Sequence, residues 1–217
     1  MTSIDNKTCL VTGGGGYLGS HLVRALLDRG CSVRVLDMCK SNIDEERVDW
    51  VQGDLRDRPT AERACENVDV VFHTAALIEL YFRAPVDFIK RVWEVNVGGT
   101  ETLLEVAARS GVQRFVHTSS TNVVFGGAAR GEDETMPYTE SKDLYSSTKA
   151  ASERAVLLAD DPNGMRTCAI RPGGIYGPGE RKTIVGPMVM AVKRGVPVFC
   201  IGNPHSRLDY TYIDNLR

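Results

Sequence analysis

The stretch "VTGGGGYLGSHL" (residues 11–22) links a short apolar run to a segment with helical periodicity. Its glycines Gly13, Gly16 and Gly19 follow the spacing GxxGxxG. Only glycine lets the backbone take a positive φ without strain or pass close to a bound pyrophosphate. The helix that follows presents free N–H groups and a positive dipole end to an anion. A glycine triplet directly after a buried strand therefore predicts a dinucleotide-binding turn.

Strand-like and helix-like segments alternate along the rest of the chain. Short apolar runs predict strands at residues 8–13, 32–37, 48–54, 69–76, 113–120, 166–173 and 196–202. Helical periodicity predicts helices at residues 19–30, 87–111, 143–159 and 183–195, the second one interrupted near Gly98–Gly99. This order predicts a doubly wound parallel sheet with helices on both faces, which is a three-layer α/β/α fold.

Composition places the chain among ordinary globular proteins and narrows its partners. The net charge of -2 indicates no nucleic-acid or anionic-membrane partner. No apolar run approaches the ~20 residues of a membrane helix, and no secretory signal is visible. The cysteines show no metal-ligand spacing, so no metal site is predicted. We expect buried, reduced thiols and a cytoplasmic location. These cysteines are Cys9, Cys31, Cys39, Cys65, Cys168 and Cys200.

The second predicted strand ends in Asp37, about 20 residues after the glycine turn. A carboxylate here can accept hydrogen bonds from both adenosine ribose hydroxyls and repels a 2′-phosphate, which favours NAD over NADP. Arg34 and Lys40 lie near enough in the sequence to weaken that preference. His73 stands alone at the end of the fourth predicted strand. We expect it to be a packed, hydrogen-bonded residue and not a metal ligand.

Hydroxyl groups gather after the fifth predicted strand. Ser119, Ser120 and Thr121 should face the crevice beyond the carboxyl ends of the strands. Tyr145 and Lys149 follow on the next helix, four positions apart and therefore on one face. An alcohol that gives up a hydride must also lose its hydroxyl proton, but a free tyrosine has a pKa of about 10. The Lys149 ammonium and a positive nicotinamide ring would pull the pKa of Tyr145 toward neutrality and make it a base.

Together these motifs resemble the extended branch of the short-chain dehydrogenase/reductase superfamily, over nearly the whole chain. The resemblance rests on GxxGxxG, on Tyr-x-x-x-Lys, and on "SSTNV", "NVGGT" and "RPGGIYGPG" (119–123, 96–100 and 171–179). It implies a Rossmann fold with NAD as cofactor. The cofactor-binding residues that it implies are Gly13, Gly16, Tyr17, Leu18, Gly19, Asp37, Asp54, Leu55, Thr74, Ala75, Ala76, Thr118, Tyr145, Lys149, Pro172, Gly173 and Ile175.

The catalytic residues that the resemblance implies are Ser120, Tyr145, Lys149 and Asn96. Ser120 would hold the substrate oxygen against Tyr145. Counting back from Gly126 selects Thr121 as the catalytic hydroxyl instead. Asn96 resembles the residue that anchors a proton-relay water in the superfamily. The alternative for Asn96 is a structural amide at a helix break.

Four further segments, "VLDM", "HTSSTNVVF", "TKAASERAVL" and "AIRPGGIYGPGE", look like the 3β-hydroxysteroid dehydrogenase and sterol-4-carboxylate 3-dehydrogenase group. That likeness implies NAD-dependent oxidation of the 3β-hydroxyl of a steroid or sterol to a ketone, with Tyr145 as base. A nucleotide-sugar 4-epimerase is the alternative. Dehydration is disfavoured, because Asn122 and Val123 stand where dehydratases usually carry Asp-Glu. A non-catalytic dinucleotide-binding sensor is the second alternative, although such proteins tend to lose the tyrosine or the lysine.

Residues 1–217 are expected to form one NAD(P)-binding Rossmann domain, in which residues 177–217 begin a substrate-side region. Extended-branch members continue from this point into a C-terminal substrate lobe. The polar loop 126–143 is long enough for a functional or mobile segment or a solvated surface loop. The expected partner is a small-molecule substrate, either a steroid or sterol or a nucleotide sugar. A homodimer is common in the superfamily, although the residues do not establish one, and no membrane association is visible in this chain.

Overall fold

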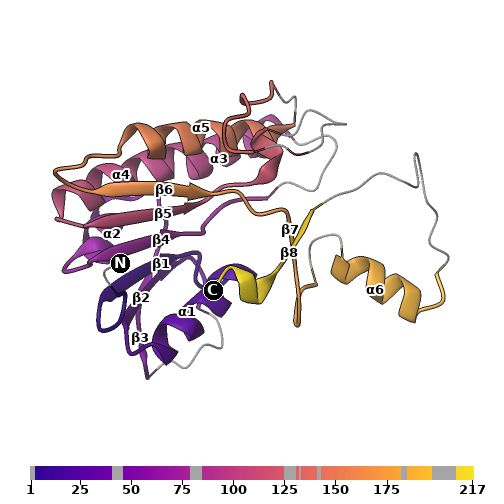
Figure 1. Ribbon diagram of the computed structural model, residues 1–217, viewed down its shortest axis with the longest axis horizontal. Helices are drawn as coiled ribbons and strands as arrows, with labels where there is room; N and C mark the ends of the chain where they lie inside the picture. Colours follow the sequence, from indigo (N-terminus) through magenta and orange to yellow (C-terminus); the bar gives the residue numbers. More distant parts are fainter. Residues whose placement is uncertain are drawn as a thin grey trace.

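A six-stranded parallel sheet forms the centre of the computed structural model, which describes residues 3–40, 46–78, 85–124, 131, 133–140, 143–181, 185–196 and 209–217 (Figure 1). Its strands are β1 (Thr8–Thr12), β2 (Ser32–Asp37), β3 (Val48–Gln52), β4 (Val70–His73), β5 (Arg114–Thr118) and β6 (Arg166–Ile170). They lie in the order β3-β2-β1-β4-β5-β6. The direction of winding reverses between β1 and β4, which opens a crevice at the carboxyl ends of these strands. The predicted doubly wound sheet is confirmed.

Helices cover both faces of the sheet and create two separate cores. Helices α2 (Arg58–Cys65), α4 (Gly99–Arg109) and α5 (Leu144–Leu158) pack on the face formed by residues such as Leu10 and Phe115. Helix α1 (Tyr17–Asp28) packs on the opposite face, against the alternate residues Val11 and Val35. Successive side chains of a strand point to opposite faces, so strands buried on both sides are apolar throughout. The three-layer architecture is therefore also confirmed.

The predicted helix 87–111 is divided into three parts. Helix α3 (Val86–Trp93) passes through a π-helical turn (Glu94–Gly98) into α4. At this turn the carbonyl of Asn96 accepts hydrogen bonds from the hydroxyls of Thr100 (2.6 Å) and Ser152 (2.6 Å). Side-chain donors of this kind satisfy a carbonyl that a regular helix would bond internally. The interruption predicted near Gly98–Gly99 is confirmed, and it begins a turn earlier than the glycines.

Helix α2 is an element that the sequence patterns do not predict. The side chain of Asp57 caps it by accepting a hydrogen bond from the N–H of Thr60 (3.1 Å), and Pro59 occupies its first turn. Both features are ordinary helix-start signals. The helix has only 8 residues, and its buried face consists of the small residues Thr60, Ala61, Ala64 and Cys65, so no large apolar side chain marks it in the sequence. The capping pattern "DRPT" is the available signal.

The chain leaves the sheet after Ile170, earlier than the predicted end of that strand. A second, two-stranded parallel ribbon follows, formed by β7 (Gly174–Tyr176) and β8 (Tyr210–Tyr212). Helix α6 (Val185–Lys193) stands apart from the three layers (Figure 1). The strand predicted at 196–202 lies outside the described residues except for its first position. That residues 177–217 begin a substrate-side region stays a prediction.

Two cysteines contradict the expectation of buried thiols. Cys9, Cys31 and Cys65 are buried, but Cys39 and Cys168 are exposed. Cys39 follows the end of β2 at the rim of the crevice. Cys168 lies on the edge strand β6 and pairs in register with Val116, on the sheet face where α1 packs mainly over β1 and β2. Cys200 lies outside the described residues. In the part of the chain that the structure describes, no helix has the length and apolar character to cross a membrane.

Candidate active site at the carboxyl ends of the strands

The turn between β1 and α1 can be built only with glycine at two positions. Gly13 has a φ of 70°, and a Cβ there would lie 2.7 Å from the Cα of Ala75. A Cβ on Gly19 would lie 2.2 Å from the carbonyl oxygen of Gly13. Both contacts are far inside van der Waals distance, and the neighbouring atoms are backbone. Within the described residues no side chain caps α1, which begins after Gly16. Its first N–H groups therefore remain available to an anion.

Asp37 is held at the rim of this turn by two backbone donors. Its carboxylate accepts hydrogen bonds from the N–H of Gly15 (2.9 Å) and of Cys39 (3.0 Å). Arg34 lies on the same strand but points away, since its guanidinium pairs with Asp49 at 2.6 Å. The same guanidinium also donates to carbonyls at the end of α2. The charge of Arg34, one of the two that could have attracted a 2′-phosphate, is thus engaged elsewhere.

Asp54 and Leu55, which the resemblance implies as cofactor-binding residues, occupy two different environments. Asp54 forms an ion pair with Arg56 at 2.6 Å, and its hydrogen bonds to Arg56 lower the pKa of the Asp54 carboxyl. Leu55 is buried in the core and packs against Gly99 at the start of α4. Their contact with a cofactor stays a prediction.

The segment after β4 forms the wall behind the glycine turn. Thr74 donates a hydrogen bond from its hydroxyl to the carbonyl of Thr12 (2.7 Å), and Ala75 lies directly against Gly13. His73 is buried between the hydroxyls of Thr12 (2.7 Å) and Thr100 (2.8 Å). Burial and, to a smaller extent, the nearby Lys149 lower the pKa of His73 to about 3. The histidine is therefore a neutral, packed residue, as predicted.

Three predicted catalytic side chains meet at the end of β5. Helix α5 begins after Asp143, which caps it by accepting a hydrogen bond from the N–H of Ser146 (2.8 Å). This start places Tyr145 in the first turn, where its phenol forms a side-chain hydrogen bond with Ser120. Lys149 follows one turn later and donates a hydrogen bond from Nζ to the carbonyl of Thr118 (2.8 Å). The structure thus brings Ser120 to the tyrosine, which favours Ser120 over Thr121.

The electrostatics of this group differ from the simplest expectation. Burial raises the pKa of Tyr145, and its hydrogen bond with Ser120 only partly opposes that rise. Burial also lowers the pKa of Lys149 to about 8. The lowered tyrosine pKa predicted from the sequence is therefore not a property of these side chains alone. It requires further positive charge beside the phenol, such as a bound nicotinamide ring.

Asn96 is buried, and its amide is hydrogen-bonded within the protein. Its oxygen accepts a hydrogen bond from the N–H of Leu77 (2.8 Å). Its nitrogen donates to the carbonyl of Leu77 (3.0 Å) and to the hydroxyl of Thr148 (3.1 Å). These contacts tie the π-helical turn, α5 and the wall segment together and support the structural alternative. A role for Asn96 in proton relay stays a prediction.

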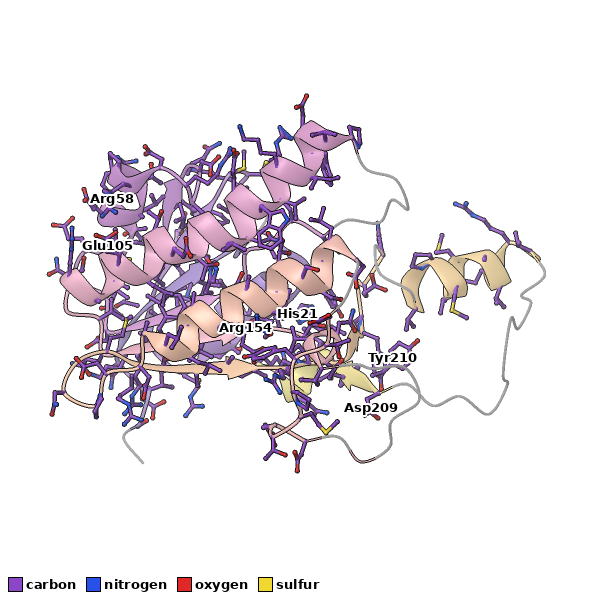
Figure 2. The ribbon with its side chains drawn as sticks, turned by 90° about the horizontal axis from the view of Figure 1, so that it is seen from above. His21, Arg58, Glu105, Arg154, Asp209 and Tyr210 are labelled. Atoms are coloured by element: carbon purple, nitrogen blue, oxygen red, sulfur yellow. The ribbon has the colours of Figure 1, made fainter. Side chains whose placement is uncertain are left out.

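The segment after β6 closes the site from the other side. The carbonyl of Pro172 accepts a hydrogen bond from the N–H of Thr121 (3.1 Å), and Gly173 donates to the hydroxyl of Thr211 (3.1 Å). Asp209 and Tyr210, at the start of β8, crowd this turn (Figure 2). A Cβ on Gly173 would lie 2.2 Å from the carbonyl oxygen of Asp209. Ile175 lies on β7.

The amino-terminal end of α1 also contacts this region. The hydroxyl of Tyr17 lies 2.8 Å from the position of a Cβ on Gly177, just beyond β7. Leu18, Thr74, Thr118 and Leu216 help to line an apolar hollow of about 50 Å³ beside the strand ends. Residues from both ends of the chain therefore converge on the edge that carries the predicted cofactor residues.

Sequence reasoning missed one group of the site, centred on Glu153. This carboxylate lies on α5 one turn after Lys149 and is buried. It contacts Ser119, Tyr138 and Arg171. The available signal is the spacing of four residues from Lys149, which places Glu153 on the same helix face as Lys149. Among the described residues no cluster of histidine, cysteine and acidic side chains could hold a metal ion.

Comparison with known proteins extends these observations. The family model described as "3-beta hydroxysteroid dehydrogenase/isomerase family" matches residues 10–217. A 3 beta-hydroxysteroid dehydrogenase/Delta 5-->4-isomerase of Mycobacterium tuberculosis is 45% identical over 212 residues, which are 95% of this chain and 57% of that protein. The mouse protein named "Sterol-4-alpha-carboxylate 3-dehydrogenase, decarboxylating" is 38% identical, over 97% of this chain and 57% of its own length. The chain thus spans just over half the length of these relatives.

Among solved structures, the UDP-glucose 4-epimerase of Thermus thermophilus in complex with NAD superposes with a TM-score of 0.81. It is 31% identical, and the match covers 96% of this chain and 71% of the epimerase. The shared architecture is the parallel sheet with its flanking helices. The curated relatives and the structural neighbour therefore share this fold but carry the names of different activities.

Proposed function

The chain belongs to the 3-beta hydroxysteroid dehydrogenase/isomerase family, and on that premise we propose that it oxidises the 3β-hydroxyl of a steroid or sterol to a ketone with NAD. The family membership confirms the resemblance that the motifs indicated. The observation that carries the proposal is the meeting of Ser120, Tyr145 and Lys149 at the end of β5, beside the glycine turn. We propose this activity and this substrate class for the whole protein; the chain spans just over half of the length of its relatives.

The residues at the crevice fit a dinucleotide. A Cβ would fill the cradle at Gly13 and Gly19, and the open N-terminus of α1 suits a pyrophosphate. Asp37 accepts a hydrogen bond from the N–H of Gly15 at the rim of the turn, where it would bind an adenosine ribose, while Arg34 is paired with Asp49. These features favour NAD over NADP. When bound, NAD supplies the hydride acceptor for the reaction.

The protein's own side chains would handle the proton. Ser120 would orient the substrate hydroxyl toward the phenol of Tyr145, because the two side chains already share a hydrogen bond. Tyr145 would then remove the hydroxyl proton as general base. Lys149 is anchored at Thr118 and would place its ammonium where it favours the tyrosinate.

The remaining partners follow from the same proposal. The substrate is a small molecule, and a homodimer through α5 and its neighbour α4 would cover Leu158, which is 87% exposed on the last turn of α5. A cytoplasmic location is consistent with the free thiols of the described cysteines.

The experiment is a substrate panel in which NADH formation is measured for every compound and formation of the epimer is measured for the UDP-sugars, because a 4-epimerase returns the hydride to the sugar in each cycle and accumulates no NADH. The proposal predicts turnover with 3β-hydroxysteroids or sterols and none with UDP-sugars; the opposite pattern would overturn it in favour of a 4-epimerase. Tyr145→Phe should reduce kcat by roughly 1,000-fold or more, since it removes the base but keeps the ring. The Kd for NADH should stay within about 3-fold of the parent value because the cradle is unchanged. Equal turnover by Tyr145→Phe and the parent would contradict the catalytic assignment.

A further inference from the structure

Glu153 joins three segments that are distant in the sequence. Its side chain is 1% exposed. It accepts a hydrogen bond from the hydroxyl of Ser119 at the end of β5. It also accepts one from the phenol of Tyr138 (3.0 Å), in the segment before α5. Arg171, directly after β6, donates to the same carboxylate from Nε (2.9 Å) and Nη2 (2.6 Å).

A buried carboxylate of this kind is hard to explain as a source of stability. Moving a carboxylate and a guanidinium out of water costs several kcal/mol per ion, and a buried pair often stabilises no better than apolar side chains of the same volume. Such a pair can nevertheless fix the orientation of the residues that it joins, because each of its hydrogen bonds requires a defined geometry. If apolar residues replaced the pair, we would expect the protein still to fold, but the residues that the pair holds would lose their fixed orientation.

We propose that Glu153 is a positioning residue that holds the serine end of β5 and the segment beginning at Arg171 in fixed relation to Lys149. This inference rests on the proposed function for its catalytic meaning, although the arrangement itself is a property of the folded chain. Glu153 touches neither substrate nor cofactor in this role. It acts through the residues that do.

The backbone contacts of Ser119 show how the position is transmitted. The N–H of Ser119 donates to the carbonyl of Ile170 at 2.7 Å, while its hydroxyl donates to Glu153. The peptide is therefore held from β6 on one side and from α5 on the other. Ser120 follows directly and forms the hydrogen bond with Tyr145. A shift of Ser119 would therefore move Ser120 by a comparable distance.

The second effect of Glu153 is on the charge of Lys149. The titratable groups around this ammonium are His73 on β4, His117 on β5, and Tyr145 and Glu153 on α5. Burial is the main cause that lowers the pKa of both histidines, so neither adds a charge near neutral pH. Glu153 raises the pKa of Lys149 against the effect of burial. Its removal should therefore lower the pKa of the lysine.

The test uses three variants. Glu153→Gln removes the charge but keeps an oxygen that can accept from Ser119. Because it also leaves Arg171 buried without its carboxylate, the neutral pair Glu153→Gln/Arg171→Gln guards against simple misfolding. Glu105→Gln on α4 is the matched control. That glutamate pairs with Arg58 and Arg109, and Figure 2 shows Arg58 and Glu105 at the end of the molecule away from Tyr210.

The first readout needs neither cofactor nor substrate. The pKa of Lys149 is measured by ¹³C NMR titration of lysine Cε, assigned with Lys149→Met. We expect it to fall by roughly 0.5–1 in Glu153→Gln, to fall by less in the double variant because the loss of the Arg171 charge acts in the opposite direction, and to stay at the parent value in Glu105→Gln. An unchanged pKa of Lys149 in both folded variants overturns the inference, whatever the protein's activity.

The second readout is turnover. In a protein that oxidises its substrate, kcat should fall roughly 10–100-fold in both Glu153 variants, while KM for NAD changes less than about 3-fold. Parent kcat in both variants contradicts the positioning role. A parent protein without turnover on any steroid or sugar contradicts the proposed function instead, and the titration alone then decides on Glu153.

Discussion

Lys149 donates a hydrogen bond from Nζ to the carbonyl of Thr118 at 2.8 Å, although the whole side chain is almost completely buried. A buried ammonium with a carbonyl partner is costly to the fold, and burial lowers the pKa of this lysine from 10.5 to about 8. The residue is therefore retained at the expense of stability, as expected for a functional group.

Lys149→Met should separate stability from activity. Between pH 8 and about 10.5 the unfolded chain binds a proton at this lysine that the folded chain has lost. The free energy of unfolding of the parent should therefore rise across this window, by on the order of 3 kcal/mol from this group. Lys149→Met should be more stable at pH 7 and lack this rise, while kcat falls at least roughly 100-fold.

Urea unfolding at a series of pH values measures the difference between the two proteins, so that other titrating groups cancel. Lys90→Met is the matched control, because the Lys90 side chain is 76% exposed in an ion pair with Glu94. It should change neither the pH dependence nor kcat. An identical pH dependence in the parent and Lys149→Met would show that the lysine is not destabilising where it lies.

Gly13→Ala should weaken both the fold and cofactor binding. The new Cβ would lie 2.7 Å from the Cα of Ala75 at a φ of 70°. Gly111→Ala is a matched control, because Gly111 has a φ of 78° with no atom within 4 Å of its Cβ position. Both variants carry the positive-φ strain of about 1 kcal/mol, so the difference between them measures the clash. We expect Gly13→Ala to lose at least about 1 kcal/mol more, with NADH affinity reduced roughly 10-fold or more.

Urea unfolding and NADH fluorescence titration report these two effects. Equal loss of stability in the two variants would mean that the wall at Ala75 yields to the extra methyl group. Parent NADH affinity in Gly13→Ala would place the cofactor away from this turn.

The fold is predictable from sequence because its defining features are local. The glycine turn, the apolar strands and the helix with Tyr145 and Lys149 can each be recognised within a few residues. Local sequence patterns do not predict those parts of the site that depend on tertiary contacts. Glu153 meets Ser119 and Arg171 only after β5, β6 and α5 have assembled. Their separations in sequence, 34 and 18 residues, leave no periodic signal.

The errors have equally specific causes. Cys168 lies in an apolar run, but β6 is an edge strand, and a run cannot reveal which of its faces a helix covers. The raised pKa of Tyr145 depends on how deeply the phenol is buried. The four-residue spacing between Tyr145 and Lys149 carries no information about that burial.

Ser120→Ala and Thr121→Ala should resolve the identity of the catalytic hydroxyl. The hydrogen bond between Ser120 and Tyr145 predicts a fall in kcat of roughly 100-fold for Ser120→Ala. Thr121 donates its backbone N–H to Pro172 (3.1 Å), and alanine keeps that bond. Thr121→Ala should therefore retain kcat within about 3-fold. The reverse order of effects would assign the role to Thr121.

Cofactor binding should protect one of the two exposed cysteines from thiol reagents. Cys39 lies at the rim of the crevice, where its N–H donates to the Asp37 carboxylate (3.0 Å). Its carbonyl oxygen lies 2.9 Å from the position of a Cβ on Gly15. A dinucleotide bound at Asp37 would obstruct this thiol. Cys168 is an internal control, because it is exposed on the edge strand β6, which β1, β4 and β5 separate from β2.

Alkylation followed by peptide mass spectrometry measures both sites in one sample. We expect saturating NADH to slow modification of Cys39 at least roughly 5-fold and to leave the rate at Cys168 unchanged. Cys168 should also react more slowly than an ordinary exposed thiol, since partial burial and the nearby Asp160 raise its pKa. Equal rates at Cys39 with and without NADH, at a concentration that saturates binding, would move the adenosine site away from Asp37.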